Sequence, residues 1–409
     1  MHLSLILVTN EDNNQETSSV FSGASEANFI YICQNQHHRF MKKLSSLLIL
    51  SMLSTLSFAQ KTNYNLIVGT YTAPGKSKGI YTYDFNTLTA VTKIKSITKN
   101  TANPSYAAIS PDNQFVYAVN ETGVTSTVSA FKYDAKTGDL TFLNKVDSQG
   151  ADPCFITVDA KNVIVANYSG GSLAVFSRKA DGSLTEALQV IKHTGKSIDP
   201  KGRQESAHVH MTKFTPDHQY LIVNDLGEDQ TYIYKYNPTS KEKILTVKSV
   251  IKTNAGTGPR HITFSPNGKF AYLAHEFNGS ITVFAYADGS LTKIQEIGTT
   301  TTDFTGKVDG ADIHVSTDGK FLYETNRGDA NSISAFSILP TGKLKFIETV
   351  STLGKGPRNF TIDPTGKFLL IGHQYTNNIV IFNRNKTTGK LTDSGKRIDV
   401  GAPVCLVFD

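Results

Sequence analysis

Short apolar runs separated by turns recur along this chain in the same arrangement. The fullest copy is Gly258–Glu276, GPRHITFSPNGKFAYLAHE, where an alternating run, a Pro-Asn-Gly turn and a second apolar run follow one another. Alternation rich in β-branched and aromatic residues predicts two antiparallel strands joined by a tight turn. Related copies start at Asn103, Asp152, Ala207, Gly310 and Gly356, and a shortened copy ends the chain at Gly401–Asp409.

Two further strands are predicted after each hairpin, for example Gly279–Ala285 and Leu291–Ile297. Four antiparallel strands per unit, repeated about every 50 residues without a helical pattern, predict an all-β propeller. The segment Tyr64–Thr72 has no inner strand before it, and the last unit has only an inner strand. We therefore expect both ends to complete one blade, which closes a seven-bladed ring and leaves no open sheet edge.

The first 60 residues differ from the rest. Residues 1–40 are polar and patternless, and they are expected to be a mis-assigned start or a disordered extension. Met41–Ala59 has two lysines, an apolar stretch and small residues before Gln60, which predicts a Sec-type signal peptide. The alternative is a signal anchor behind a real extension. The prediction is an exported protein, periplasmic or secreted, without a stable membrane anchor, in which residues 60–409 form the propeller.

Composition narrows the possible partners. The net charge is +6 over 409 residues, and no basic run is interleaved with aromatic residues, so nucleic acid is not expected as a partner. Cys154 and Cys405 fall in inner strands of non-neighbouring repeats, which argues against a disulfide between them. No Cys/His cluster has the spacing of a metal site, so neither a metal nor a cofactor is expected. We expect a monomer that takes a small molecule.

The repeat gathers polar residues at one rim of the ring. The first two strands of a blade are antiparallel, so the start of one and the end of the next lie at the same rim. Strand starts supply His208, His210, Arg260, His261, Asp312, His314, Arg358 and Asn359. Strand ends supply Asn120, Glu121, Asn167, Tyr168, Asn224, Asp225, His275, Glu276, Asn326 and Arg327.

Each polar group at this rim has a functional and a structural interpretation. His208 and His210 are two residues apart on one strand, which suits paired acid/base work, but they could also be the polar lining of a wet channel. Arg260 and Glu276 lie at the two ends of one hairpin, as part of a site or as a structural ion pair. Several arginines around one axis suit a carboxylate or phosphate ligand, unless nearby aspartates neutralise them.

Several motifs in order give the chain a family resemblance. VGTYT, NPSYAAISPD, AHVHMTKFTPD, NDLGED, GPRHITFSPNGKFAYLAHE, GADIHVSTDGKFLYETNRG and GPRNFTIDPTGKFLLIGHQ occur between residues 64 and 409. They resemble the seven-bladed propeller lactonases, which include the cyclo-isomerase-type 6-phosphogluconolactonase and the carboxymuconate lactonising enzymes. The resemblance implies a catalytic set of His210 (or His208), Arg260, Glu276 and Arg327. His275 stands where relatives commonly have Asn before the Glu.

The expectation is a metal-independent hydrolase of a sugar-type or anionic lactone. Glu276 or His210 would be the general base, and Arg260 and Arg327 would hold the substrate anion and the developing oxyanion. We expect Glu276 to serve turnover rather than folding. The predicted export conflicts with 6-phosphogluconolactone as substrate, because sugar phosphates are cytosolic metabolites. The alternatives are a lactonising cyclo-isomerase of an unsaturated dicarboxylate and a non-catalytic binding propeller. Substrate-binding candidates are His208, Asn167, Asp225, His261, His314, Asn326 and Arg358.

Overall fold

The computed structural model describes residues 36–43, 61–73, 75–199, 202–240 and 243–409. It divides into two units, residues 1–61 and 62–409. Within the first unit, residues 36–43 are helical. The predicted signal peptide lies outside the described residues except for Met41–Lys43. No helix among the described residues is long and apolar enough to span a membrane.

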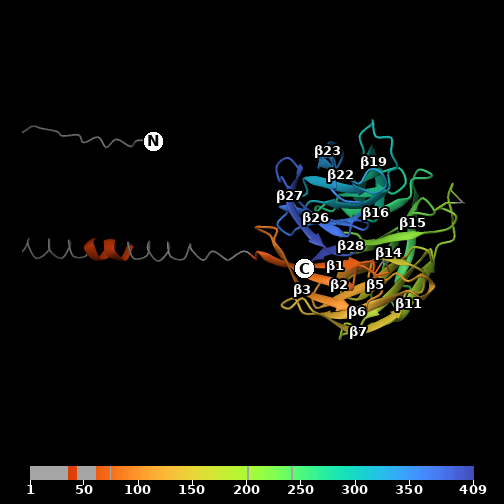
Figure 1. Ribbon diagram of the computed structural model, residues 1–409, viewed down its shortest axis with the longest axis horizontal. Coiled ribbons are helices and arrows are strands. Elements are labelled where there is room, and N and C mark those ends of the chain that lie inside the picture. Colours follow the sequence, from red (N-terminus) through yellow and green to blue (C-terminus); the bar gives the residue numbers. More distant parts are fainter. Residues whose placement is uncertain (1–35, 44–60, 74, 200–201, 241–242) are drawn as a thin grey trace, which may run out of the picture. The chain divides into compact units, whose positions relative to one another are not determined.

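Seven four-stranded antiparallel sheets form the second unit and confirm the predicted propeller (Figure 1). The inner strands are β4 (Tyr106–Ile109), β8 (Pro153–Val158), β12 (Val209–Phe214), β16 (Pro259–Phe264), β20 (Gly310–Val315), β24 (Pro357–Ile362) and β28 (Pro403–Phe408). The second strands are β1 (Asn63–Thr70), β5 (Phe115–Asn120), β9 (Asn162–Asn167), β13 (Tyr220–Asp225), β17 (Phe270–His275), β21 (Phe321–Asn326) and β25 (Phe368–His373).

The third strands are β2 (Gly79–Asn86), β6 (Thr127–Tyr133), β10 (Ser172–Arg178), β14 (Gln230–Tyr236), β18 (Ser280–Ala287), β22 (Ser332–Ile338) and β26 (Asn378–Arg384). The outer strands are β3 (Thr92–Lys99), β7 (Leu140–Asp147), β11 (Leu184–Lys192), β15 (Leu245–Lys252), β19 (Ser290–Gly298), β23 (Leu344–Ser351) and β27 (Leu391–Asp399). A short 3-10 helix, η1 (Gly123–Thr125), lies between β5 and β6.

Burial falls from the ring's inside to its outside. The second strand β5 is buried at every position, whereas the outer strand β11 alternates between half-buried and exposed residues. The apolar clusters join residues of neighbouring blades, for instance Val165 of β9 with Tyr117 of β5. The core therefore lies between blades, and it fixes the distance of each inner strand from the axis.

The ring closes as the sequence predicted. β28, the last strand, pairs with β1, the first strand of the propeller, and the sheet order is β28-β1-β2-β3 (Figure 1). Asp409 accepts hydrogen bonds at 2.9 Å from both the backbone and the side-chain nitrogen of Asn65. Cys154 and Cys405 are buried free thiols, in agreement with the expectation of no disulfide between them.

Candidate active site at one rim of the propeller

Most inner strands have a β-bulge near their start, and the unpaired residue at each bulge belongs to the first group of site residues. In the β16–β17 pair, Pro259 faces His275 and His261 faces Ala274, so Arg260 between them has no partner. Such a bulge re-aims one side chain, here toward the central channel. The same shift in register isolates one residue in four other blades: Cys154, His210, Arg358 and Val404.

A second recurring position directly follows each second strand. In six blades its backbone N–H donates to the carbonyl of the residue directly before the inner strand, as Glu276 does to Gly258 at 2.8 Å, and in the seventh Glu121 donates to Asn103, three residues before β4. Most of these preceding residues have a positive φ, such as Gly258 at 65°, which favours glycine. The seven residues at this position are Tyr71, Glu121, Tyr168, Leu226, Glu276, Arg327 and Gln374. The two recurring positions therefore build most of the site.

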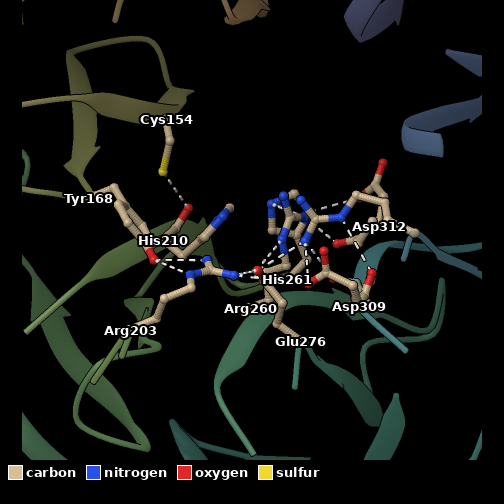
Figure 2. Close-up of polar contacts among 12 residues, drawn as sticks. Cys154, Tyr168, Arg203, His210, Arg260, His261, Glu276, Asp309 and Asp312 are labelled. Atoms are coloured by element: carbon tan, nitrogen blue, oxygen red, sulfur yellow. Dashed lines mark hydrogen bonds and ion pairs between the residues drawn. The ribbon is translucent and has the colours of Figure 1, made fainter. Parts of the chain in front are cut away.

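Three guanidinium groups surround the Glu276 carboxylate (Figure 2). Arg260 Nε donates to Oε2 at 2.9 Å, and Arg327 Nη2 lies 3.0 Å from Oε1. Arg203 Nη1 donates to the same Oε1. Arg327 also contacts Asp309 Oδ1 at 3.2 Å. Arg260 and Glu276, at the two ends of one hairpin, are thus in contact.

The burial of this cluster changes the role expected for Glu276. Its side chain is 1% exposed, as is that of Arg260. Burial alone would raise the pKa of the Glu276 carboxyl group. The surrounding guanidinium groups outweigh that effect and hold the pKa well below its usual value. Both carboxylate oxygens are in contact with guanidinium groups, so Glu276 is poorly placed to take a proton from water, and removing its charge would leave buried cations unpaired.

Arg203 is a site residue that the sequence did not reveal. It lies in the longest connection between an outer and an inner strand, from β11 to β12, of which residues 200–201 are outside the described residues. Its guanidinium lies between Tyr168 and Glu276 and donates hydrogen bonds to both side chains (Figure 2). The guanidinium carbon of Arg203 also makes cation–π contacts, 5.8 Å from the ring centre of Tyr168 and 5.2 Å from that of Phe277. Its side chain is 46% exposed, so this arginine faces solvent. The unusual loop length was the one available signal.

His210 provides a neutral imidazole beside these cations. Its Nδ1 is buried without a hydrogen-bond partner in the described part of the chain. The ring makes an edge contact with Tyr168, with centroids 5.6 Å apart. Burial lowers the pKa of His210 well below its usual value, and the charge of Arg260 lowers it further. His210 is therefore unprotonated at neutral pH and able to accept a proton.

His208, the other member of the pair, is engaged in local contacts. Its Nδ1 lies 3.0 Å from the carbonyl oxygen of Tyr168, and its Nε2 lies 3.0 Å from Glu205 Oε1. The ring stacks on that of Tyr168 with centroids 4.4 Å apart. His208 thus supports the tyrosine that holds Arg203.

A layer of side chains fills the channel below the bulge residues. His261 Nδ1 contacts Asp312 Oδ1 at 2.8 Å, and its ring centroid lies 5.3 Å from that of Phe155. Tyr106, three blades away around the ring, lies 6.4 Å from His261. His314 Nε2 is 2.9 Å from Asp312 Oδ2. His261 also contacts the site itself, because its Nε2 lies 3.3 Å from Arg260 Nη1 and its ring centroid lies 5.2 Å from that of His210. His314 contacts Asp312 and the ring of Phe360 instead.

Arg358 lies on another side of the channel. Its guanidinium carbon is 5.7 Å from the ring centre of Tyr71, whose hydroxyl donates to Glu121 Oε2 at 2.8 Å. Its charge contributes to the lowered pKa values of His210 and Arg260. Among the described residues, Arg358 has no ion pair with a carboxylate.

Three predicted binding residues are not part of this group. Asn167 donates to the carbonyl of Ser148, in the connection from β7 to β8, at 2.9 Å. Asn326 donates to the Thr299 hydroxyl, in the connection from β19 to β20, at 2.7 Å. Asp225 accepts from the backbone N–H of His208 at 2.8 Å and contacts His193 at 2.7 Å. All three are fully buried hydrogen-bonding residues that shape the blades.

One group among the described residues could offer metal-ligand atoms: His193, Asp225 and Glu228, whose donor atoms lie within 4.8 Å of one another. Protein groups already occupy these atoms. His193 Nε2 lies 2.9 Å from the Tyr234 hydroxyl, and Glu228 accepts from Tyr232 and the Gly195 N–H. The chemistry of the group is that of a hydrogen-bonded network under the β11–β12 connection.

Comparison with known proteins agrees with this architecture. Residues 65–408 match the family described as lactonase, 7-bladed β-propeller. The chain is 38% identical over 352 residues to the 6-phosphogluconolactonase of Bacillus subtilis, covering 85% of this chain and 99% of that protein.

Solved structures show the same likeness. A putative 6-phosphogluconolactonase from Bacteroides fragilis is 43% identical with a TM-score of 0.82, covering 86% of this chain and 99% of the other. A protein described as a periplasmic gluconolactonase from Pseudomonas aeruginosa is 35% identical with a TM-score of 0.81, covering 85% and 99%. The chain therefore belongs to the seven-bladed β-propeller lactonase family.

Proposed function

We propose that this protein hydrolyses a sugar-type lactone, with His210 as the general base. The observation that carries the proposal is the neutral, buried imidazole of His210 beside a cluster of fixed cations. His210 takes a proton from water, and the resulting hydroxide adds to the lactone carbonyl carbon. Collapse of the adduct breaks the ring C–O bond, and the proton returns to the ring oxygen, which gives the open-chain acid.

The arginines supply the electrostatic part of this mechanism. Burial and repulsion from Arg327 lower the pKa of Arg260 only to about 10, so Arg260 stays a cation at neutral pH. Glu276 holds Arg260 and Arg327 in place, which preorganises positive charge for the oxyanion. Glu276 thus anchors the cations in this proposal, and the sequence-based alternative of Glu276 as the base is set aside.

The substrate is proposed to be polyhydroxylated and anionic. Arg358 has no carboxylate partner among the described residues, and Arg203 is the exposed guanidinium of the cluster. A carboxylate or phosphate on the substrate would satisfy these two groups. The names of the relatives, gluconolactonase and 6-phosphogluconolactonase, support a gluconolactone skeleton.

Export and a monomeric state complete the proposal. The leader-like layout of Met41–Ala59 supports export, as does the relative described as periplasmic. The site side chains all come from one chain, which needs no second copy. N-terminal mass analysis of the native protein should find a start near Gln60, and light scattering should find the monomer mass.

A lactone panel tests the activity. Glucono-, 6-phosphoglucono- and galactonolactone are assayed on the mature protein with and without a chelator, with spontaneous hydrolysis subtracted. We expect hydrolysis of at least one lactone that is unaffected by the chelator. Binding of these ligands without hydrolysis would instead support the non-catalytic propeller, and lactone formation from an unsaturated diacid would support the cyclo-isomerase.

A further inference from the structure

The carboxylate of Asp229 holds two separate segments of the chain at once. It lies in the turn between β13 and β14 and is 4% exposed. Oδ1 accepts the backbone N–H of Gly258 at 2.7 Å and that of Thr257 at 3.1 Å. Oδ2 accepts the N–H of Gly256 at 2.7 Å and the hydroxyl of Ser197 at 2.5 Å. Each oxygen is therefore fully used.

Both segments lead directly to the site. Gly258 precedes the strand that begins Pro259-Arg260, and its carbonyl accepts the N–H of Glu276 at 2.8 Å. Ser197 lies in the β11–β12 connection, which also carries Arg203. The neighbouring Glu228 holds the same connection through the N–H of Gly195. Asp229 thus contacts the supports of the Arg260–Glu276 pair and of Arg203.

The equivalent turns of other blades show how Asp229 differs from the residues at the same position. The residue before the third strand has a positive φ in five blades: Gly171, Asp229, Gly279, Asn331 and Asn377. Asn331 Oδ1 accepts the N–H of Gly356 at 2.8 Å, and Asn377 Oδ1 accepts that of Ala402 at 3.0 Å. One amide oxygen is enough for this contact. At the same position in its own blade, Asp229 has a second carboxylate oxygen, and this oxygen accepts the additional hydrogen bonds from Gly256 and Ser197.

We propose that Asp229 is a positioning residue that sets Arg260 and Glu276 through Gly258 and sets Arg203 through Ser197. The inference rests on the proposed function, because these three residues surround the site assigned there. Asp229 touches neither the substrate nor the reacting atoms. Loss of its side chain should therefore loosen the catalytic geometry, and small displacements of reacting groups can cost up to about a hundredfold in rate.

The test compares Asp229→Gly with Asn377→Gly. Glycine occupies the equivalent place in two blades, so both variants suit the positive φ. Both lose the contact that holds the next inner strand, but the strand after Ala402 carries Val404 where β16 carries Arg260. Asp229→Gly loses the four accepted hydrogen bonds named above and Asn377→Gly loses one, so we expect the larger drop in Tm in Asp229→Gly, and kcat should fall about 10–100-fold only in that variant. Equal kcat in the two variants would overturn the proposal.

Ser197→Ala separates the two arms. It removes the hydroxyl that donates to Oδ2 and keeps the Oδ1 contacts with Thr257 and Gly258, so we expect intermediate kcat. Full wild-type kcat in Ser197→Ala would remove the Ser197 arm from the proposal.

Hydrogen exchange on the same proteins does not depend on activity. Asp229→Gly should speed exchange of the Gly258 and Glu276 amides, and Asn377→Gly should not. Unchanged exchange at Glu276 would overturn the positioning role even in an active enzyme. If the wild-type protein hydrolyses no lactone, but the two variants show the expected exchange pattern, then the proposed function is wrong and the positioning role of Asp229 stands.

Discussion

Arg358 lies over the ring of Tyr71, with 5.7 Å between the guanidinium carbon and the ring centre. Arg203, Arg260 and Arg327 all contact the carboxylate of Glu276. Arg358 contacts no carboxylate in the described part of the chain. Within the described residues, Arg358 is therefore a site cation whose charge no contacting carboxylate neutralises, so it is available to a ligand.

Replacing this cation should affect anionic substrates selectively. For Arg358→Gln we expect kcat/KM on 6-phosphogluconolactone to fall about 10–100-fold, as a lost charge-assisted contact is worth about 1.5–3 kcal/mol. Hydrolysis of neutral gluconolactone should change little. Arg397→Gln, on the outer strand β27, is the control and should leave both rates unchanged. Equal losses on the two lactones would remove the anion-binding role from Arg358.

His210→Gln should abolish most of the turnover and leave the fold intact. Loss of a general base lowers kcat by about 10²–10⁴. The Nδ1 of His210 makes no hydrogen bond among the described residues, so the Tm should change little. His208→Gln is the matched control from the same segment and should lose much less kcat. The base assignment fails if the two variants are equally active.

The pH profile of kcat/KM should show a base that is neutral well below pH 6.5. The folded pKa of His210 is lowered by burial and by Arg260, His261 and Arg358, against the opposing charge of Glu276. Activity should be flat from about pH 6.5 to 8 and should be lost only as pH falls through the lowered pKa. Stopped-flow assays with the spontaneous rate subtracted check this. An acid limb centred at or above pH 6.5 would contradict the assignment.

Glu276→Gln should lose stability as well as activity, contrary to the expectation from sequence. Removing one partner of a buried ion pair costs about 3–5 kcal/mol, and here several guanidinium groups lose their counter-charge. Gln374 occupies the equivalent position in the β24–β27 blade, so the side chain itself fits. Urea unfolding and kcat are measured on the same sample. Wild-type stability with a pure kcat defect would restore Glu276 as a candidate base.

Three buried histidines should make the propeller less stable in mild acid. Burial lowers the pKa values of His261, His275 and His373 to about 4 each. The unfolded chain binds these protons near pH 6.5 and the folded chain only near pH 4, so the free energy of unfolding should fall as pH falls between these values. Each histidine contributes about 1.4 kcal/mol per pH unit in that window.

His373→Asn isolates one of these contributions. Asn167 and Asn326 occupy the equivalent strand ends, so the fold accepts this side chain. The unfolding free energy is measured by urea titration at pH 5, 6 and 7. Its slope against pH should decrease by the contribution of about one proton, which is about 1.4 kcal/mol per pH unit. A wild-type slope in His373→Asn would contradict the prediction.

The sequence predicted what the repeat determines. The strand order, the ring closure and the contact between Arg260 and Glu276 follow from alternation and hairpin geometry, which act locally. The sequence could not reveal Arg203, because an irregular connection places it and no repeat position marks it. It also could not show that Glu276 is buried, since its partners come from different parts of the ring. Asn167, Asp225 and Asn326 each end a second strand, one residue before the recurring position that includes Glu276, and this one-residue difference separates them from the Glu276 cluster.

The pairing of β28 with β1 joins residues as far apart as Asn65 and Asp409, separated by 344 positions. During translation β28 is made after all the other strands, long after its partner β1 has left the ribosome. At about 5–20 residues per second, the nascent protein spends tens of seconds as an open arc with the edge of β1 unpaired. A chain cut before Pro403 would keep that sticky edge and become a target for chaperones and proteases.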